Sequence, residues 1–330
     1  LEKIKDIIQN ASVIVTNMNP VLAVYSKIVG AKVVFIDILP WMDASVESRI
    51  QSVKMLNRNS EFLKSVPNVE TYYQNIDIFI MQNYLEEFPI DSKIRNYEIV
   101  SPLLDPFVYD GLKNVSENRL LICTGGLFNP DVNPSTLFSY SEVVIDVAHR
   151  IAEQNGIAEI ILCGPPALSK LVRPYKGKVK IKALCLAHHD FVQLLSTSRY
   201  VAIVPGLTSI YETFALGCNT LLLPPTNYSQ VLQTQAVRNK NLDGNLICEN
   251  LFPQMLHICE ENGEIQATQK LMELIDEVIE SRKFHSAIEK GLTQLFLCPN
   301  SDITQIRKQY IHNMGKNAVQ KILDSISQLI

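Results

Sequence analysis

A glycine turn followed by two hydroxyl residues is the feature of this sequence best suited to chemistry. Gly206 follows the apolar residues 201–204 and leads into Thr208 and Ser209. A helix that begins here offers free N–H groups, a favourable dipole and hydroxyl donors to an anion. Glycine at the turn lets the backbone approach such a ligand closely. The pattern therefore predicts a phosphate or diphosphate site.

Glu212 lies one helical turn beyond this start. That is too far along the helix to meet the same anion, but it suits the hydroxyls of a ribose attached to a diphosphate. Together the stretch fits a nucleoside diphosphate. A glycine followed by Thr and Ser is also an ordinary helix start with a hydroxyl cap, and the turn taken alone favours that simpler interpretation.

The elements that position this turn are a strand, a helix and a second strand. Residues 201–204 form a buried strand, and Ile210 and Phe214 then follow helical spacing up to Gly217. Residues 220–223 return to strand character. Two buried strands joined by a helix are the βαβ unit, so we expect a parallel sheet with helices on both faces.

Length and composition limit the number of domains and the classes of partner that this protein can have. The chain has 330 residues, 47% of them hydrophobic, which is enough for two domains with cores of their own. A formal net charge of −4 shows no bulk preference for nucleic acid or for an anionic membrane. Seven cysteines without a C-x-x-C pair, mostly in apolar runs, predict reduced and buried thiols in a cytoplasmic protein. No apolar run is long enough to form a transmembrane segment.

The run from 206 to 227 resembles the nucleotide-sugar site of GT-B fold glycosyltransferases. It is most similar to that of the bacterial N-acetylglucosaminyltransferases acting on lipid-linked muramyl pentapeptide. The shared pattern is a Gly-x-Thr/Ser-Ser/Thr-x-x-Glu helix start, an Ala-x-Gly turn, a strand ending in prolines and a glutamine-rich helix start. The matching residues are Gly206, Thr208, Ser209, Glu212, Ala215, Gly217, Pro224, Pro225, Gln230 and Gln233. The resemblance implies that the first helix start holds the diphosphate and that Glu212 holds the ribose.

Other candidate residues depend more on this resemblance. The loop at Gly125 and Gly126 follows a predicted strand over 119–123, and although a double glycine alone indicates a tight turn, the resemblance implies that it approaches the diphosphate. His188, in a loop over 185–190, is implied to lie near the nucleobase. A zinc site there is disfavoured, because the adjacent pair of histidines lacks a spaced third ligand.

Gln230 and Gln233 are implied to bind hydroxyls of the donor sugar. The acidic residue that accompanies these glutamines in similar enzymes is replaced here by Tyr228 and Ser229. The alternative interpretation is a polar helix start that faces solvent.

The first third of the chain repeats the alternation of helix and strand, with strands over 12–16 and 32–38. We therefore expect two Rossmann-like, doubly wound parallel-sheet α/β domains that face each other across a cleft, as in the GT-B fold. Residues 1–112 form the acceptor-side domain, 113–300 the donor-binding domain, and 301–330 helices that pack back on the first domain. The glycine-rich loop with which similar enzymes begin has no counterpart here, so either the first strands are missing from this sequence or the protein lacks them.

These features predict a metal-independent, inverting glycosyltransferase of the hexosyltransferase type. Its partners are a nucleotide-diphosphate sugar, preferably a UDP-sugar, and a small-molecule or lipid-linked acceptor, with no cofactor. Asp37, at the end of a predicted strand, is the candidate general base, and the alternative is an acid that caps a loop. The competing functions are a nucleotide-sugar epimerase or hydrolase of the same fold, and a non-catalytic nucleotide-sugar-binding subunit.

Overall fold

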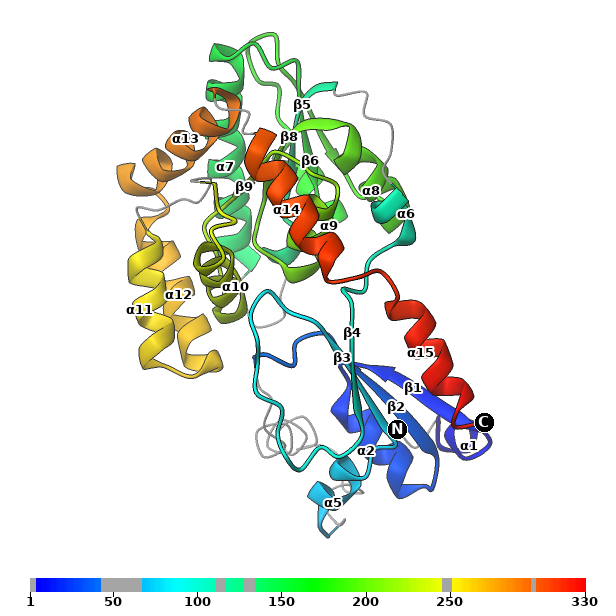
Figure 1. The fold of residues 1–330 in the computed structure, drawn as a ribbon. Helices are drawn as coiled ribbons and strands as arrows, with labels where there is room; N and C mark the ends of the chain where they lie inside the picture. Colours follow the sequence, from blue (N-terminus) through cyan, green and yellow to red (C-terminus); the bar gives the residue numbers. More distant parts are fainter. Residues whose placement is uncertain (1–3, 43–66, 111–116, 128–133, 245–250, 298–300) are drawn as a thin grey trace. The chain divides into compact units, whose positions relative to one another are not determined.

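A computed structural model describes residues 4–42, 67–110, 117–127, 134–244, 251–297 and 301–330 (Figure 1). The chain forms two compact units, Leu104–Asn313 and a unit made of Leu1–Leu103 with Met314–Ile330. The domain boundary expected near 112, and the helix expected over 42–64 beyond its first residue, lie outside the described residues. The C-terminal helices, expected to pack together on the first domain, are divided between the two units.

The first unit contains a parallel sheet of four strands in the order β1-β2-β3-β4. The strands are β1 (Val13–Asn17), β2 (Lys32–Asp37), β3 (Ile78–Gln82) and β4 (Tyr97–Val100). Its helices are α1 (Lys5–Gln9), α2 (Pro20–Ile28), α5 (Val69–Gln74) and α15 (Ala318–Ser327). The sheet agrees with the strands expected over 12–16 and 32–38, shifted by a residue at their ends.

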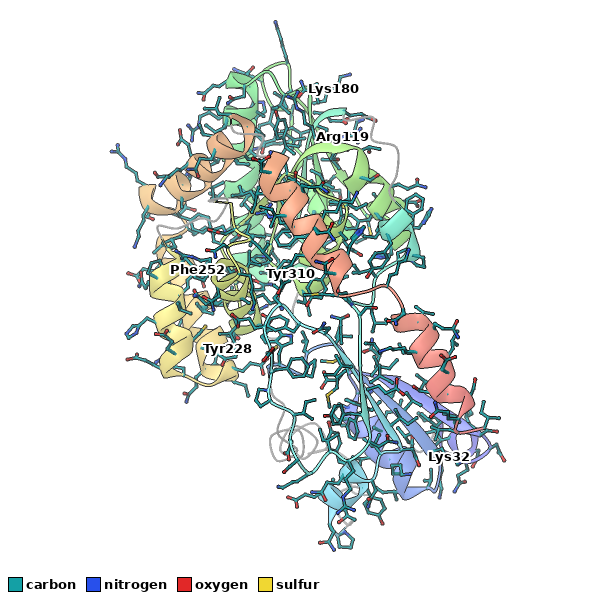
Figure 2. The ribbon with its side chains drawn as sticks, in the orientation of Figure 1. Lys32, Arg119, Lys180, Tyr228, Phe252 and Tyr310 are labelled. Carbon is teal, nitrogen blue, oxygen red and sulfur yellow. The ribbon has the colours of Figure 1, made fainter. Side chains whose placement is uncertain are left out.

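Alternate residues of β2 enter two separate cores, which explains why its sequence is apolar throughout. Val33 and Phe35 pack with residues of α2 and α5. Val34 packs on the opposite face in a cluster that includes Ala318 of α15. Lys32, labelled in Figure 2, donates a hydrogen bond from Nζ to the carbonyl of Leu329 (2.8 Å), so the C-terminal helix is also tied to the sheet by polar contacts.

The second unit contains five parallel strands in the order β7-β6-β5-β8-β9. They are β5 (Glu117–Cys123), β6 (Glu159–Cys163), β7 (Lys180–Leu184), β8 (Ser198–Ile203) and β9 (Thr220–Leu222). The chain first builds outward from β5 through β6 to β7, and then crosses to place β8 on the other side of β5. The carboxyl ends of β5 and β8 therefore flank a topological switch point, which is where open α/β sheets bind ligands.

Helices of the second unit connect these strands and continue after β9. They are α6 (Pro106–Asp110), α7 (Pro134–Gln154), α8 (His188–Thr197), α9 (Leu207–Ala215), α10 (Tyr228–Asn239), α11 (Phe252–Glu261), α12 (Glu264–Val278), α13 (Arg282–Leu297) and α14 (Ser301–Asn313). Two 3₁₀ turns cover Gly125–Leu127 and Pro166–Leu171. In the part of the chain that the structure describes, no helix has the length and apolar character needed to cross a bilayer.

Arg307 ties α14 to the centre of the second unit. Its side chain has no solvent exposure and donates hydrogen bonds to the carbonyl oxygens of Leu242 (2.6 Å), Asp243 (2.7 Å) and Thr220 (3.3 Å). Its guanidinium carbon lies 4.5 Å from the centroid of the Phe214 ring on α9. Burial lowers the pKa of Arg307 to about 10, which leaves it charged at neutral pH. A buried cation thus joins α14, α9 and the end of the sheet.

Candidate nucleotide site

Gly206 precedes α9, where its backbone is extended (φ −103°, ψ 142°) and needs no glycine. A Cβ atom added there would meet nothing closer than Ser209 Oγ at 4.0 Å. The space beside the first turn of α9 is therefore open, and Thr208 is exposed next to it. Since the first N–H groups of a helix have no partner within the helix, this start offers donors to an anion.

The loop after β5 reaches the same place. Cys123, the last residue of β5, pairs in register with Ile203 of β8. Burial raises the pKa of its thiol, while hydrogen bonds from the Gly125 N–H and the Ser209 side chain oppose that rise. One sulfur therefore touches both the glycine turn Gly125–Leu127, which includes Gly126, and the start of α9. The structure brings together the two loops that the resemblance assigned to the diphosphate.

Glu212 is buried one turn into α9, with 1% of its surface exposed. Its Oε1 atom has no hydrogen-bond partner among the described residues. Burial raises the pKa of Glu212 to about 8, and the nearby carboxylate of Asp105 contributes to the rise. Both effects favour the protonated carboxyl over the carboxylate in the free protein. A buried acceptor with no partner is costly, so its position indicates a ligand group.

His188 lies in the first turn of α8 rather than in the expected loop. Its Nε2 atom is 3.0 Å from Oε1 of Glu212, which is an ion-pair distance, but the contact lacks the alignment of a hydrogen bond. The sequence-based hypothesis placed His188 near a nucleobase and did not foresee this contact. Among the described residues, no group of three or more His, Cys, Asp or Glu side chains is arranged to hold a metal ion.

The two glutamines of α10 differ in their surroundings. Gln230 is buried, and its Oε1 accepts hydrogen bonds from the N–H (2.8 Å) and hydroxyl (3.0 Å) of Thr226. Gln233 is equally buried at 3% exposure, and its Oε1 has no partner among the described residues. The solvent-facing alternative is therefore wrong for both. Gln230 stabilises the turn after β9, whereas the Oε1 atom of Gln233 is available to accept a hydrogen bond from a ligand.

Tyr228 and Ser229 occupy the positions where similar enzymes carry an acidic residue, and both form contacts within the protein. The N–H of Tyr228, labelled in Figure 2, donates to Thr268 Oγ1 at 3.3 Å. Ser229 Oγ donates to the side chain of Asn227 at 2.9 Å, and that side chain also caps α10. Neither residue supplies a carboxylate to the site.

Asp37 ends β2 in the first unit and is 5% exposed. Its Oδ1 accepts a hydrogen bond from the N–H of Leu39 at 2.9 Å, so it caps the turn that follows the strand. Trp41, the single tryptophan of the chain, stacks on Tyr84 with ring centroids 4.1 Å apart. In this state both side chains have structural partners of their own.

Two residues of the site were not singled out from the sequence. Cys123 was interpreted only as a buried thiol, and Asp105 was given no role. Asp105 precedes α6, acts electrostatically on Glu212, and has an Oδ2 atom 3.9 Å from Nδ1 of His189. In the sequence, Asp105 stands out only as an acidic residue between Pro102 and Pro106. That pattern does not predict a contact with Glu212 on α9.

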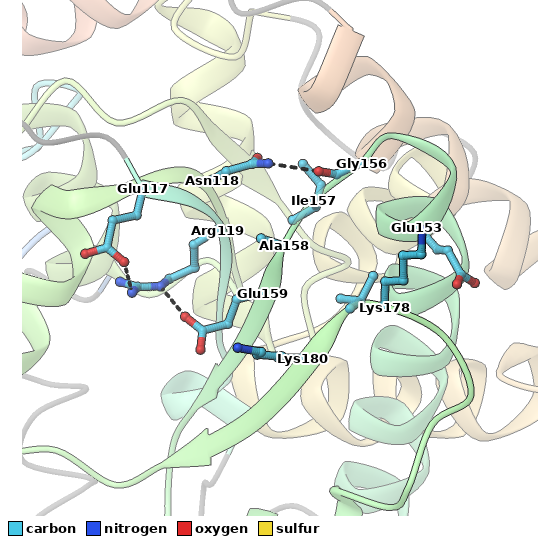
Figure 3. A pocket seen from close by; sticks show the side chains of 11 residues that line it. Glu117, Asn118, Arg119, Glu153, Gly156, Ile157, Ala158, Glu159, Lys178 and Lys180 are labelled. Carbon is cyan, nitrogen blue, oxygen red and sulfur yellow. Dashed lines mark hydrogen bonds and ion pairs between the residues drawn. The ribbon is translucent and has the colours of Figure 1, made fainter.

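A cavity of about 520 Å³ lies at the opposite, amino ends of β5, β6 and β7 (Figure 3). Arg119 forms ion pairs there with Glu117 and with Glu159 (2.9 Å), and Lys182 also reaches Glu159 at 2.7 Å. Burial raises the pKa of Glu159, but the hydrogen bonds from Lys182 and Arg119 outweigh it and leave that pKa below its ordinary value. These charges satisfy one another, so this cavity is not the anion site predicted from the sequence.

Comparison with solved structures identifies the class of fold. The spinosyn forosaminyltransferase SpnP matches with a TM-score of 0.54 and 10% identity, over 99% of this chain and 79% of that protein. Phytolacca americana UGT2, solved with UDP-2-fluoroglucose and pterostilbene, matches with a TM-score of 0.50 and 9% identity, over 99% and 78%. No protein-family profile and no curated protein sequence matches the chain. Its two parallel-sheet α/β units therefore have the GT-B fold, as the sequence predicted.

Proposed function

We propose that this protein is a glycosyltransferase that takes a sugar from a nucleoside diphosphate. The observation that carries the proposal is the buried Glu212 carboxyl, whose Oε1 has no hydrogen-bond partner, one turn beyond an open helix start. A diphosphate at Gly206 and the Gly125 loop would place a ribose hydroxyl next to that oxygen. The similar solved structures, a forosaminyltransferase and a protein that binds UDP-2-fluoroglucose, support the same reaction class.

In this proposal the protein assists the departure of the diphosphate. The N–H groups at the start of α9, the hydroxyls of Thr208 and Ser209, and the Gly125 loop stabilise the negative charge that develops on the leaving group. Gln233 supplies its open acceptor to a hydroxyl of the donor sugar. We propose a single displacement, which inverts the anomeric carbon, with a hexose as the sugar transferred.

A general base must take the proton of the acceptor, and Asp37 keeps that role in the proposal. Its Oδ1 accepts a hydrogen bond from the N–H of Leu39, which fixes the orientation of the carboxylate at the end of β2. UDP is the preferred carrier, and the sequence resemblance to enzymes of lipid-linked muramyl peptides is the reason to include lipid-linked acceptors beside small molecules. An epimerase, a hydrolase and a binding subunit would use the same nucleotide site without an acceptor.

A thermal-shift screen with UDP-, dTDP-, GDP- and CMP-sugars tests the nucleotide site. A ligand at about 100 times its Kd adds roughly 2.7 kcal/mol to the native state. Product analysis after incubation with the selected donor alone, and then with acceptors, separates transfer from epimerisation and hydrolysis. If no nucleotide sugar stabilises the protein, the proposed function is wrong.

Replacing Glu212 by Gln tests the ribose contact. We expect Glu212→Gln to lower the affinity for a nucleoside diphosphate more than tenfold, because charge-assisted hydrogen bonds are each worth on the order of 1.5 to 3 kcal/mol. Pyrophosphate, which has no ribose, should bind as it does to the parent. Calorimetry with both ligands decides the matter. Equal losses for the two ligands, or no loss for either, would remove Glu212 from the site.

Chelation tests how the charge of the leaving group is balanced. The sequence contains no D-x-D motif of the kind that holds a metal beside a nucleotide diphosphate. We therefore expect turnover with the donor found in the screen to be unchanged by an excess of EDTA. Activity that is lost in EDTA and returns with magnesium or manganese would contradict this expectation.

A further inference from the structure

His188 and Glu212 form a contact that the proposed ribose role of Glu212 does not explain. Their closest atoms, Nε2 and Oε1, are 3.0 Å apart. The exposed fraction is 55% for the His188 side chain and 2% for that of Glu212. Only the imidazole reaches solvent, so the carboxyl can exchange a proton with its surroundings most directly through His188.

The surroundings of Glu212 make its ionisation unfavourable. Titratable groups surround Glu212 on the neighbouring elements, namely His188 on α8, Asp105 before α6, Cys123 on β5, Cys218 after α9, and Arg307 and Lys308 on α14 beyond Cys218. Burial and the carboxylate of Asp105 both raise the pKa of Glu212. The thiols of Cys123 and Cys218 have raised pKa values and remain neutral. His188 is the group at ion-pair distance from Glu212.

We propose that His188 takes up the proton that Glu212 gives up when a nucleoside diphosphate binds. Once the exposed imidazole turns into line with Oε1, the O–H bond of the carboxyl breaks and an N–H bond forms on Nε2, so no proton leaves the protein. The imidazole must start with its hydrogen on Nδ1. Ribose hydroxyls then donate to a carboxylate that is paired with an imidazolium. The inference rests on the proposed function and makes His188 a positioning residue that acts through Glu212.

His189 provides a matched control on the next position of the chain. Its side chain is also 55% exposed, but its Nδ1 faces Asp105 at 3.9 Å and its Nε2 lies 3.0 Å from Nε2 of Gln193. Its ring packs against Phe107, with centroids 5.0 Å apart. Replacing His189 therefore removes an equivalent imidazole from the same helix start without removing the contact to Glu212.

The test measures proton release and affinity by calorimetry. Uridine diphosphate is the probe, replaced by GDP or thymidine diphosphate if the screen selects one of them, and titrations at pH 7 use PIPES and Tris, whose ionisation enthalpies differ. We expect the parent and His189→Asn to release almost no proton and to keep their affinity within about twofold between pH 7 and pH 9. We expect His188→Asn to release about one proton and to bind about tenfold more weakly at pH 7 than at pH 9, since its carboxyl must ionise into solvent.

Three results would overturn the inference while leaving the nucleotide site intact. They are a parent that itself releases a proton, a His188→Asn protein that loses affinity equally at every pH, and one that binds more tightly than the parent. The second result would indicate that His188 contacts the ligand directly. The third would indicate that its side chain hinders the ligand from reaching Glu212. If the parent binds none of these nucleotides, that result contradicts the proposed function itself, and the inference, which depends on it, is then also wrong.

Discussion

Replacing Gly206 by Val lowers the affinity for a nucleoside diphosphate at least a hundredfold, which corresponds to about 2.7 kcal/mol. The backbone of Gly206 is extended, a conformation that Val adopts readily, and its Cβ position is empty. The folded protein therefore accommodates the side chain. The new methyl groups occupy the space through which a phosphate would reach the first N–H groups of α9. Calorimetry with nucleoside diphosphate and with pyrophosphate should show the same loss, since both need this space.

Gly263 provides the control for this substitution. It precedes α12 in a similarly extended conformation (φ −70°, ψ 166°), and a Cβ atom added there would meet nothing within 4 Å. Gly263→Val therefore imposes the same change on a helix start that no prediction connects with a ligand. We expect the two variants to unfold at similar denaturant concentrations and to differ only in binding. Parent-like affinity in Gly206→Val would show that the turn is merely structural.

Replacing Arg307 by Met lowers the free energy of unfolding by about 3 kcal/mol, because buried carbonyl groups that lose their donor each cost about 1 to 3 kcal/mol. The three carbonyls are those that the guanidinium bonds at Leu242, Asp243 and Thr220. Met fills most of the volume and retains a contact with the Phe214 ring, so the loss reports polar contacts more than a cavity. Removal of a desolvated charge offsets part of the cost. Denaturant unfolding of the parent and the variant measures the difference.

Arg150 is the comparison for Arg307. It forms two bonds of 3.0 Å with Glu289, between α7 and α13, but its side chain is 47% exposed. Arg150→Met should cost less than about 1 kcal/mol, because solvent screens exposed ion pairs. If both variants lose the same stability, burial of Arg307 does not account for its effect.

The strands could be predicted because each is a short apolar run bounded by turn residues. The predicted strand over 119–123 lies within β5, and that over 220–223 agrees with β9 to within a residue. Helix starts were harder to place. The loop expected over 185–190 already contains the start of α8 at His188, since polar residues in a first turn carry no apolar period.

The site could be predicted where one local segment contains it. Gly206, Ser209 and Glu212 lie within one turn and one helix, so their spacing already places them together. The contacts of Glu212 with His188 and Asp105 could not be predicted, since they join residues from three separate elements. Burial decides the protonation of Glu212, and burial depends on the packed structure rather than on the residue type.

The division of the chain into Leu1–Leu103 with Met314–Ile330, and Leu104–Asn313, also affects the order in which the protein is made. One face of the first sheet, including Val34, Ile78 and Ile80, is covered by α15 at the far end of the chain. That helix follows the whole of Leu104–Asn313 in the sequence, so it is synthesised after the continuous second unit. The first unit therefore cannot be completed until the second has been synthesised, and its uncovered sheet face is the surface that a chaperone would need to shield during translation.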